Sequence, residues 1–576
     1  MTDSNEPYNV VICGGGLAGL TLSLQLKQQN PALYITVIEK TERPLKEAAH
    51  KVGESTVEIG AHYLSQKLGL KSYIDKKQFP KLGLRYFYGD SSQPFENRPE
   101  LGPSMFSPVP TYQLDRGRLE TDLREKVLNS GIELLEGASL KDISITSRSE
   151  SNQVTYIHNE EEKTLSANWV VDAMGRRRYL QTKLGLKKES PHSASSVWFR
   201  LEGKVTVDDF VSKENTAWHQ RNIEDRYYST NHLMGLGYWV WLIPLSSGNT
   251  SIGIVTQNDL HYFGEYARSF ETSLNWLEKH EPKLAKLIKG KEPLDFRKIK
   301  NYSYGSKQLF SENGWSCVGE SGIFSDPFYS PGSDMIAITN TFTANLIKAD
   351  FSKQLSSGKV EQLNRFILGT MFPDQLSYYT DGYHTFGNTQ VAATKFLWDT
   401  LYYWRVYAHA FMNGVFDDLD QLKKFESYVK KLSKLNQTLQ LSFKNWADST
   451  ESRDAFSYAD LARKEVFIQS AISLLTRPKA ENLERHLKKQ VDYFNDLKLE
   501  IGQHFNQTSD SNSTAFSEFH GQLSSNSKRK NKINRFISRI GNGMFLYSVR
   551  DIYVQLLVRG KQRVHLGWVL KMLYAK

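Results

Sequence analysis

The sequence predicts an α/β fold, in which a nucleotide-binding β-α-β unit is interleaved with a second β-sheet domain and followed by a helical C-terminal region. Three observations predict this fold. At residues 9–39 a short β-branched run leads into a glycine-rich turn, a helical pattern and a second strand pattern. Residues 190–300 contain mostly short, aromatic-rich strand patterns, and helical spacing dominates after about residue 340. The 576 residues are enough for two or three domains.

These patterns divide the chain into four parts. Residues 1–345 are expected to form the core, with a substrate sheet at about 190–300, and residues 346–505 a helical cap. The Ser/Asn-rich composition of residues 506–530 is typical of a flexible linker. Residues 531–576 interleave apolar and basic residues, as amphipathic interfacial helices do.

The first unit carries a glycine fingerprint. Gly14, Gly16 and Gly19 fit G-x-G-x-x-G between the strand NVVIC and a helix, and Glu39 ends the second strand pattern, twenty residues after Gly19. Such glycines let the backbone turn tightly and approach a pyrophosphate at the helix N-terminus, while the acidic residue binds ribose hydroxyls. A glycine-rich turn without a ligand is the alternative. The register of both strands, the helix and Glu39 favours a Rossmann-type dinucleotide site.

Two tryptophans stand one residue apart in GYWVWLIP. Side chains at i and i+2 of a strand point to the same face, so Trp239 and Trp241 are expected to line one wall. Tryptophan is large and usually needs a partner for its N–H group. The pair alone fits the wall of a wide cavity and a corner of the core equally well.

Composition excludes several classes of protein. No window approaches 18 uninterrupted apolar residues, and the N-terminal sequence lacks the pattern of a secretion signal, so we expect a cytoplasmic protein. Cys13 and Cys317 cannot form a disulfide framework. No C-x-x-C or paired histidine motif predicts a metal site.

Positive charge is concentrated in the last fifty residues. The formal net charge is +10, and residues 527–576 contain twelve Lys or Arg against a single acidic residue, Asp551. We therefore expect docking on an anionic surface, either a membrane to which the protein is peripherally bound or an acidic carrier protein, and no nucleic-acid binding. A C-terminal helix packed on the core with a solvated basic face fits the pattern at least as well.

Three further segments resemble those of aromatic-monooxygenase-like flavoproteins. VVDAMGR, with Asp172 and Gly175, is similar to their second flavin segment, and VGESGIFSDP, with Gly319 and Glu320, is similar to their C-terminal one. Arg116 matches an arginine that lies along the flavin. The resemblance implies FAD as the cofactor. Because no second glycine fingerprint is present for a nicotinamide, we expect a separate flavin reductase.

Four motifs in order resemble those of flavin-dependent halogenases. WVWLIP, beginning at Trp239, matches the family signature, and FSDPFYSPG resembles its second signature. FPKLGLRYFYG places Lys81 where the family carries its catalytic lysine. The segment KVGEST resembles a flavin-contacting turn; its residues are Gly53, Glu54 and Ser55. The aromatic content of the helical region is similar to the caps of phenol-directed and carrier-directed members.

The resemblance implies an activity for each motif. Reduced FAD and O2 convert a halide, held at the turn that contains Ser330, Gly332 and Ser333, to hypohalous acid. The tryptophans keep the aromatic substrate away from the flavin, and Lys81 delivers electrophilic halogen to an electron-rich ring. Burial would lower the pKa of that lysine and supply neutral amine near pH 7. A solvated lysine before a strand is the alternative interpretation of Lys81.

Three residues depart from the halogenase pattern. Pro331 has no N–H to offer a halide, and the Asp334 carboxylate would repel an anion unless it is paired or points away. Tyr329 stands where tryptophan-specific members have Glu, so a phenol-like ring, free or on a carrier protein, is the expected substrate. A flavin-dependent hydroxylase or oxidoreductase of the same fold that does not halogenate is the alternative function. A non-catalytic flavin-binding or membrane-docked scaffold is the third.

Overall fold

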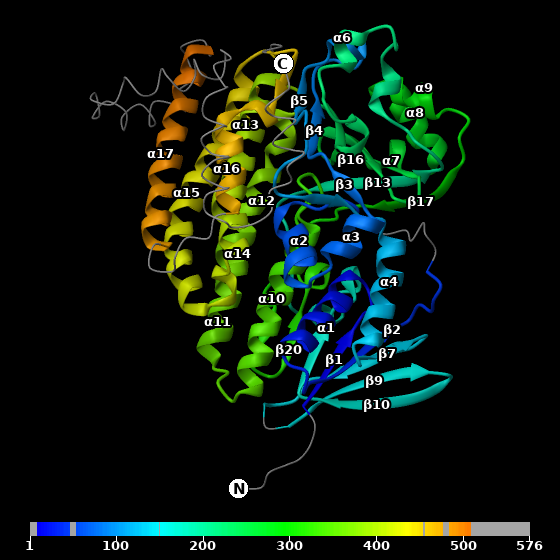
Figure 1. Ribbon diagram of the computed structural model, residues 1–576, viewed down its shortest axis with the longest axis vertical. Coiled ribbons are helices and arrows are strands. Elements are labelled where there is room, and N and C mark those ends of the chain that lie inside the picture. Colours follow the sequence, from blue (N-terminus) through cyan, green and yellow to red (C-terminus); the bar gives the residue numbers. More distant parts are fainter. Residues whose placement is uncertain (1–7, 46–52, 149, 453–455, 476–482, 509–576) are drawn as a thin grey trace.

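The computed structural model describes residues 8–45, 53–148, 150–452, 456–475 and 483–508. It contains two main sheets, one above the other in Figure 1, and a layer of helices that runs alongside both. The lower sheet belongs to the nucleotide-binding unit and the upper one to the second domain. This arrangement is the predicted α/β fold with a helical C-terminal region.

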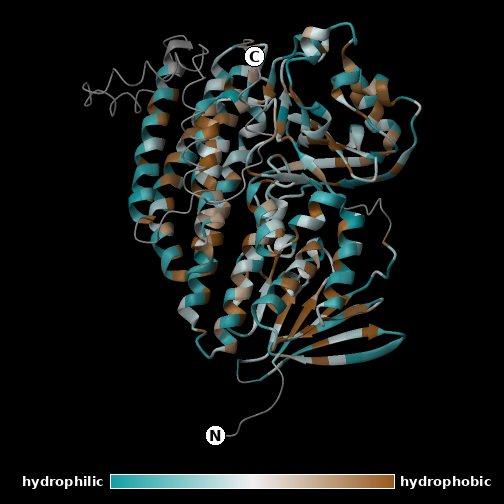
Figure 2. Cartoon of the chain, in the orientation of Figure 1, coloured by the Kyte–Doolittle hydropathy of each residue, from teal (hydrophilic) through white to brown (hydrophobic). Residues whose placement is uncertain are grey.

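The nucleotide-binding unit is built on a six-stranded sheet in the order β19-β20-β11-β1-β2-β7. All neighbouring strands are parallel except β19 and β20. The strands are β1 (Asn9–Cys13), β2 (Tyr34–Glu39), β7 (Glu133–Glu136), β11 (Trp169–Asp172), β19 (Phe310–Ser311) and β20 (Trp315–Cys317). NVVIC forms β1 at the centre, where both faces are covered, which explains its uninterrupted apolar run. Figure 2 shows these strands as the hydrophobic interior of the unit.

Helices cover this six-stranded sheet. The main ones are α1 (Leu17–Gln29), α4 (Arg116–Asn129) and α10 (Gly332–Phe351), and α1 packs against both others. The β1-α1-β2 unit that the glycine fingerprint predicts is therefore present. Because α10 begins at Gly332, the helical part of the chain starts before residue 346, the expected beginning of the cap.

The second domain contains an eight-stranded sheet in the order β17-β13-β16-β15-β14-β4-β5-β21. Its strands are β4 (Leu84–Phe87), β5 (Glu100–Gly102), β13 (Ala194–Leu201), β14 (Thr230–Gly235), β15 (Tyr238–Pro244), β16 (Thr250–Gln257), β17 (Pro293–Ile299) and β21 (Tyr458–Asp460). Five strands fall within the expected range of 190–300, and three come from outside it. The short β21 comes from within the helical region, between Ser449 and Glu465, and pairs with β5, which would otherwise be an open edge.

Smaller elements complete the core. Three further small sheets pair β10-β9-β8, β3-β6 and β12-β18. Their strands are β3 (Phe79–Lys81), β6 (Thr111–Gln113), β8 (Ser139–Ser144), β9 (Asn152–His158), β10 (Glu161–Ala167), β12 (Lys187–Glu189) and β18 (Tyr304–Ser306). Short helices are α2 (Glu58–His62), α3 (Lys71–Lys77), α5 (Tyr179–Lys183), α6 (Thr216–His219), α7 (Phe263–Tyr266), α8 (Phe270–His280) and α9 (Pro282–Ile288).

The helical region packs its apolar stripes against both domains. Its helices are α11 (Ser357–Phe366), α12 (Phe372–Thr380), α13 (Thr389–Tyr402), α14 (His409–Met412), α15 (Leu419–Ser449), α16 (Glu465–Leu474) and α17 (Leu483–Thr508). The long α15 contacts α12, α13 and α17 and ties the layer together. Since α17 continues to Thr508, it enters the expected linker of residues 506–530. The rest of that linker and the basic segment 531–576 lie outside the described residues.

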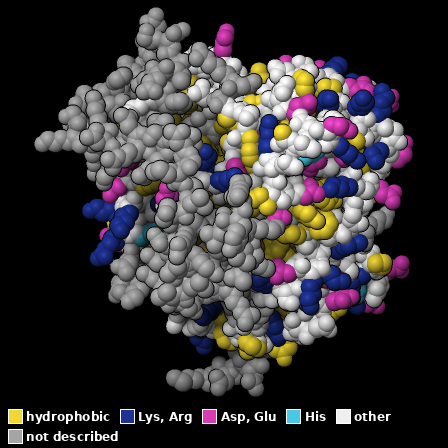
Figure 3. Space-filling view, turned by 45° about the horizontal axis from the view of Figure 1, so that its top comes forward, with side chains coloured by type: hydrophobic (Ala, Val, Ile, Leu, Met, Phe, Trp, Pro, Cys, Tyr) yellow, Lys and Arg dark blue, Asp and Glu magenta, His cyan; other side chains and the backbone are white. Residues whose placement is uncertain are grey.

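Three features of the described part of the chain bear on membranes, metals and disulfides. No helix there is long and apolar enough to cross a membrane. No group of three His, Cys, Asp or Glu side chains there is placed to hold a metal ion. Cys13 and Cys317 are buried free thiols. On the face shown in Figure 3, Lys and Arg side chains are interspersed with Asp and Glu.

Candidate active site

The glycine turn between β1 and α1 leaves no room for side chains. Gly14 has a φ of +114°, and a Cβ there would lie 2.5 Å from the Ala173 carbonyl oxygen. A Cβ on Gly19 would lie 1.9 Å from the carbonyl oxygen of Gly14. Gly16 forms the N-cap of α1 without a capping side chain. The helix therefore begins with bare backbone N–H groups, which is the arrangement that accepts a phosphate group.

Glu39 lies at the end of β2 beside this turn. Its Oε2 accepts a hydrogen bond from the Gly15 N–H (2.7 Å), and its Oε1 accepts one from the Thr41 N–H (2.9 Å). The Arg124 guanidinium lies 3.8 Å from Oε1. These contacts fix the carboxylate, and each oxygen retains a second lone pair for a ribose hydroxyl.

The turns after β11 and β20 lie side by side. Asp172 is fully buried and accepts hydrogen bonds from the N–H groups of Met174 (3.0 Å) and Leu180 (2.9 Å), and burial raises its pKa to about 6. Its carboxylate therefore shapes the turn that contains Gly175. Gly175 and Gly319, one in each turn, have φ values of +56° and +57°, which glycine adopts without strain.

Charged side chains flank the space beside these turns. Arg116, the first residue of α4, binds Glu120 Oε1 (2.5 Å) and the Gly53 carbonyl oxygen (3.4 Å). Glu320 has a side chain that is 31% exposed and lies 4.0 Å from the Arg176 guanidinium. A carboxylate and two guanidinium groups thus lie near these turns, where the Arg116 guanidinium is held by Glu120 and the Gly53 carbonyl oxygen.

The segment Gly53–Ser55 is fastened to the eight-stranded sheet. Arg200 Nη2 lies 2.7 Å from Glu54 Oε1, and both side chains are buried. Ser55 Oγ lies within hydrogen-bond distance (2.8 Å) of Thr230 Oγ1. The Glu54 charge is therefore compensated within the protein, and the backbone of this segment, rather than that charge, is what a ligand would contact.

Trp239 and Trp241 lie on one face of β15 and form what we call the tryptophan wall. They pack into the core shared with the nucleotide-binding unit, whereas Val240 between them packs into the separate core of the second domain. Their ring centroids are 5.6 Å apart. Trp239 Nε1 donates to Tyr383 Oη (2.8 Å) and Trp241 Nε1 to Ser251 Oγ (3.2 Å), so both buried N–H groups are paired.

The tryptophan wall borders a cavity of about 60 Å³, here called the small cavity. Residues from four predicted motifs line it together. They are Gly53, Glu54, Ser55, Trp239, Trp241, Glu320, Ser330 and Gly332. The tryptophan pair therefore borders this cavity and also packs in the shared core, so each of the two initial interpretations describes part of its setting.

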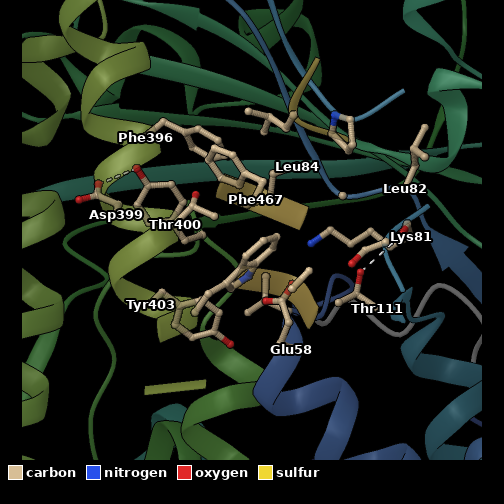
Figure 4. Close-up of a pocket in the computed structure, with 18 of the residues that line it drawn as sticks. Glu58, Lys81, Leu82, Leu84, Thr111, Phe396, Asp399, Thr400, Tyr403 and Phe467 are labelled. Carbon is tan, nitrogen blue, oxygen red and sulfur yellow. Dashed lines mark hydrogen bonds between the residues drawn. The ribbon is translucent and has the colours of Figure 1, made fainter. Parts of the chain in front are cut away.

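A second cavity of about 140 Å³, the large cavity, lies between the second domain and the helical region. Its lining is mostly apolar and aromatic, with Phe396 from α13 and Phe467 from α16 facing Leu84 from β4 (Figure 4). Lys81 and Glu58 also face this cavity. An aromatic ring of modest size fits such a lining.

Lys81 ends β3 and is only 3% exposed, so it is not a solvated lysine. Its Nζ donates to the Thr56 carbonyl oxygen (2.7 Å). Burial lowers its pKa to about 7, although the nearby carboxyl groups of Glu58 and Asp334 favour the charged form. A substantial fraction of neutral amine is therefore present at neutral pH.

The turn from Tyr329 to Asp334 separates the two cavities. Ser330 and Gly332 line the small cavity, whereas Tyr329, Pro331 and Asp334 line the large one. Ser330 has a φ of +57°, an uncommon conformation for a residue other than glycine. Alternate residues from Tyr329 to Gly332 thus line opposite cavities, and a strained residue such as Ser330 is common at functional sites.

The same turn begins α10. Pro331 is the N-cap, and the first helical hydrogen bond runs from Met335 N–H to the Pro331 carbonyl oxygen (2.9 Å). The N–H groups of Gly332 and Ser333 precede that bond and have no acceptor within the helix. Ser333 itself lines neither cavity, and its Oγ is buried without a partner among the described residues.

The Asp334 carboxyl group accepts a hydrogen bond at each oxygen. A free carboxylate so close to the expected halide site would repel the anion. Asp334 Oδ1 accepts from the Gly60 N–H (2.7 Å) and its Oδ2 from Tyr403 Oη (2.5 Å). Burial raises its pKa to about 7. The carboxyl group lies on the large-cavity side of the turn, so it does not face the small cavity.

Some predicted residues lie apart from both cavities, and some cavity residues escaped sequence reasoning. The residues that line neither cavity are Gly14, Gly16, Gly19, Glu39, Arg116, Asp172, Gly175, Gly319 and Ser333. Those not foreseen include Glu58 and Tyr403. Glu58 follows the KVGEST motif by only two residues, and that proximity is the signal that could have identified it. No local signal distinguishes Tyr403 from the other aromatic residues of α13 and its extension.

Comparisons with known proteins agree with this geometry. A family model described as an FAD binding domain matches residues 7–252. The flavin-dependent halogenase chlA of Dictyostelium discoideum is 29% identical over 391 residues, covering 62% of this chain and 63% of that protein. The 1H-pyrrole-2-carbonyl-[peptidyl-carrier protein] brominase of Pseudoalteromonas luteoviolacea is 26% identical over 353 residues, covering 60% of this chain and 78% of that protein.

A solved structure has the same fold over most of the chain. The halogenase PltM, in complex with phloroglucinol and FAD, superposes with a TM-score of 0.60 at 17% identity, covering 85% of this chain and 97% of that chain. The bare glycine turn at α1, with Glu39 beside it, suits the pyrophosphate and ribose of a dinucleotide, and the cofactor of this protein is FAD. The family model and the relatives together support placing the chain in the flavin-dependent halogenase family.

Proposed function

We propose that the protein is a halogenase that uses reduced FAD, O2 and a halide ion to transfer electrophilic halogen through Lys81 to an electron-rich aromatic ring. One observation carries the proposal. A buried lysine with a pKa of about 7 faces an aromatic-lined cavity, which a single turn separates from a cavity bordered by the tryptophan wall. Oxidant and substrate would then occupy different compartments.

In the small cavity the protein holds the halide and excludes the substrate. When bound, the reduced flavin would supply two electrons with which O2 is activated to oxidise the halide to hypohalous acid, the other oxygen atom leaving as water. The Gly332 and Ser333 N–H groups at the start of α10 are the donors for the halide, supported by the helix dipole. The tryptophan wall fills the space through which an aromatic ring would reach the flavin.

In the large cavity Lys81 carries the halogen. Its neutral amine takes X⁺ from HOX, forming an N–X bond and releasing hydroxide, which combines with the displaced amine proton to give water. The aromatic ring then attacks the halogen, the N–X bond breaks with its electron pair returning to nitrogen, and the ring proton leaves to restore the amine. A hydrogen bond from Lys81 to intact HOX is an equivalent route with the same overall balance.

The substrate is proposed to be phenol-like, free or bound to a carrier protein. Tyr329 and other aromatic side chains line the large cavity, and its size suits a single ring. Similarity to a brominase whose name specifies a pyrrolyl group on a peptidyl-carrier protein, and to a halogenase bound to phloroglucinol, supports both forms.

A separate flavin reductase is proposed as partner. The described residues contain the single glycine fingerprint at Gly14–Gly19, and the sequence has no second G-x-G-x-x-G for a nicotinamide. The purified protein is therefore expected to bind FAD and to oxidise NADH or NADPH slowly when alone.

The proposed docking of residues 531–576 on an anionic membrane or carrier is tested by flotation with neutral and anionic vesicles.

The deciding experiment combines the FAD-loaded protein with a flavin reductase, NADH, bromide and a panel of phenols, and identifies products by mass spectrometry. A product with the bromine isotope pair supports the halogenase. A product that gains only oxygen would support the alternative, an aromatic hydroxylase, which the loss of one N–H donor at Pro331 favours.

A further inference from the structure

The polar end of the large cavity contains two buried groups without partners. Gln375 and Tyr378 are each 5% exposed, and both line this cavity. Gln375 Oε1 and Tyr378 Oη make no hydrogen bond to any described residue. Buried polar atoms are nearly always paired, and leaving one unpaired costs about 1–3 kcal/mol, so such atoms beside a cavity indicate a ligand that pairs with them.

The two groups lie together on one face of α12. They are three residues apart, the spacing that places side chains as neighbours on a helix. The Tyr378 ring lies 5.7 Å from Lys395 Nζ, and Lys395 in turn binds Asp399. Asp399 is on the opposite side of the cavity from Lys81 in Figure 4. Gln375 and Tyr378 therefore belong to the end of the cavity away from Lys81.

This end of the cavity carries no uncompensated charge. Asp399 receives hydrogen bonds from Lys395, from Tyr329 Oη (2.8 Å) and from Gln440 Nε2 (2.6 Å). Burial keeps the pKa of Tyr378 well above its usual value, so its hydroxyl remains protonated and can donate. A charged substituent would find no partner here.

We propose that Gln375 and Tyr378 form a subsite for a second, neutral hydroxyl group of the aromatic substrate, which donates to Gln375 Oε1 and accepts from Tyr378 Oη. A hydroxyl is the small neutral group that does both. The substrate class is thereby narrowed from phenols to aromatic compounds with a hydroxyl at each end, and the subsite would select which ring carbon faces Lys81. This proposal rests on the proposed function.

Matched ligand pairs test the subsite without turnover. Isothermal titration calorimetry of the FAD-loaded protein compares resorcinol with 3-methylphenol, 4-hydroxybenzyl alcohol with 4-ethylphenol, and 4-(2-hydroxyethyl)phenol with 4-propylphenol. Each pair exchanges a hydroxyl for a methyl of similar size. We expect the hydroxyl member of at least one pair to bind about tenfold more tightly, because sites built to hydrogen-bond a group discriminate against its apolar analogue.

Variants assign that preference to the two side chains. Gln375→Leu and Tyr378→Phe are each expected to reduce it to about twofold or less, with little change for the methyl partner. Tyr402→Phe is the matched control, since Tyr402 Oη is bonded to Asp374 (2.9 Å) and the residue does not line the cavity. The control should keep the preference for the hydroxyl member but lose thermal stability. Tyr378→Phe breaks no hydrogen bond to a described residue, so its thermal stability should be unchanged.

Two results would overturn the subsite. In one, no hydroxyl member binds more tightly to the unaltered protein, as expected if only water occupies this end of the cavity. In the other, the preference survives both substitutions. Either result leaves the proposed function testable, because formation of bromophenol from phenol itself, which has no second hydroxyl, is measured separately.

Discussion

Replacement of Lys81 by methionine or alanine should abolish halogenated product while reduced flavin continues to consume O2 at nearly the normal rate. The reason is position: Lys81 faces the large cavity, on the far side of the Tyr329–Asp334 turn from the small cavity. Methionine keeps much of the buried stem, so the fold and FAD binding are expected to persist. Arginine should not restore activity, because its guanidinium stays protonated.

The expected size of the lysine effect follows from its pKa. A lysine with an ordinary pKa of about 10.4 is neutral in roughly 0.04% of molecules at pH 7. A pKa of about 7 makes about half of the Lys81 amines neutral. Burial thus increases the reactive form by about a thousandfold, and halogenation should rise between pH 6 and 8 as the neutral fraction rises.

The assay follows two signals from the same reaction. Flavin is reduced in advance, mixed with O2, bromide and a phenol, and its reoxidation is recorded while brominated product is quantified by mass spectrometry. The pH dependence near 7 should appear in product formation and be absent from flavin reoxidation. Brominated product from Lys81→Ala at a near-normal rate would refute the role of the lysine. Loss of O2 consumption in the same variant would place the lysine in the flavin site.

Three further predictions concern the surroundings of these sites. Glu58→Gln removes a carboxylate that raises the pKa of Lys81, so the rise of halogenation should shift to lower pH; an unchanged or higher midpoint would contradict the coupling. Gly19→Val should abolish FAD retention on gel filtration, read by flavin absorbance, whereas Gly358→Ala, with nothing within 4 Å, should retain it. Tyr383→Phe removes the acceptor of a buried indole N–H in the tryptophan wall, together with the hydrogen bond from the same hydroxyl to Asp326 and its contact with the Tyr302 hydroxyl. It should lower the free energy of unfolding by at least about 1–3 kcal/mol in denaturant titration, and no change would mean that this hydroxyl contributes nothing to stability.

The parts of the structure that sequence reasoning predicted are governed by local patterns. The strand, glycine turn and helix at Asn9–Gln29 follow from an apolar run, residues without Cβ atoms and helical spacing, all within a few turns of chain. The common face of the tryptophan wall follows from the two-residue period of a strand. Each of these features needs no knowledge of a distant partner.

The remaining features depend on partners far away in the sequence. The helical pattern of α12 predicts a buried face, yet only the folded chain brings Gln375 to the cavity that Lys81 also lines. The bond between Tyr403 and Asp334 joins residues 69 positions apart. The strand β21 pairs with β5 across more than 350 residues. Amphipathic spacing indicates that a face is buried, but it carries no information about which residues cover it.

The departures from the halogenase pattern at Pro331 and Asp334 have a common structural explanation. Asp334 would repel a halide only as a free carboxylate facing it, but two donors hold it on the large-cavity side, where it lies near Lys81. Pro331 lacks an N–H, but at the N-cap of α10 its fixed φ starts the helix, and the next two amides remain open. Pro331 thus removes one backbone N–H donor from the turn and fixes the backbone where α10 begins. Alternate residues of the turn line the two cavities. Pro331 and Asp334, which looked least compatible with halide binding, therefore belong to the partition on which the proposed separation of oxidant and substrate depends.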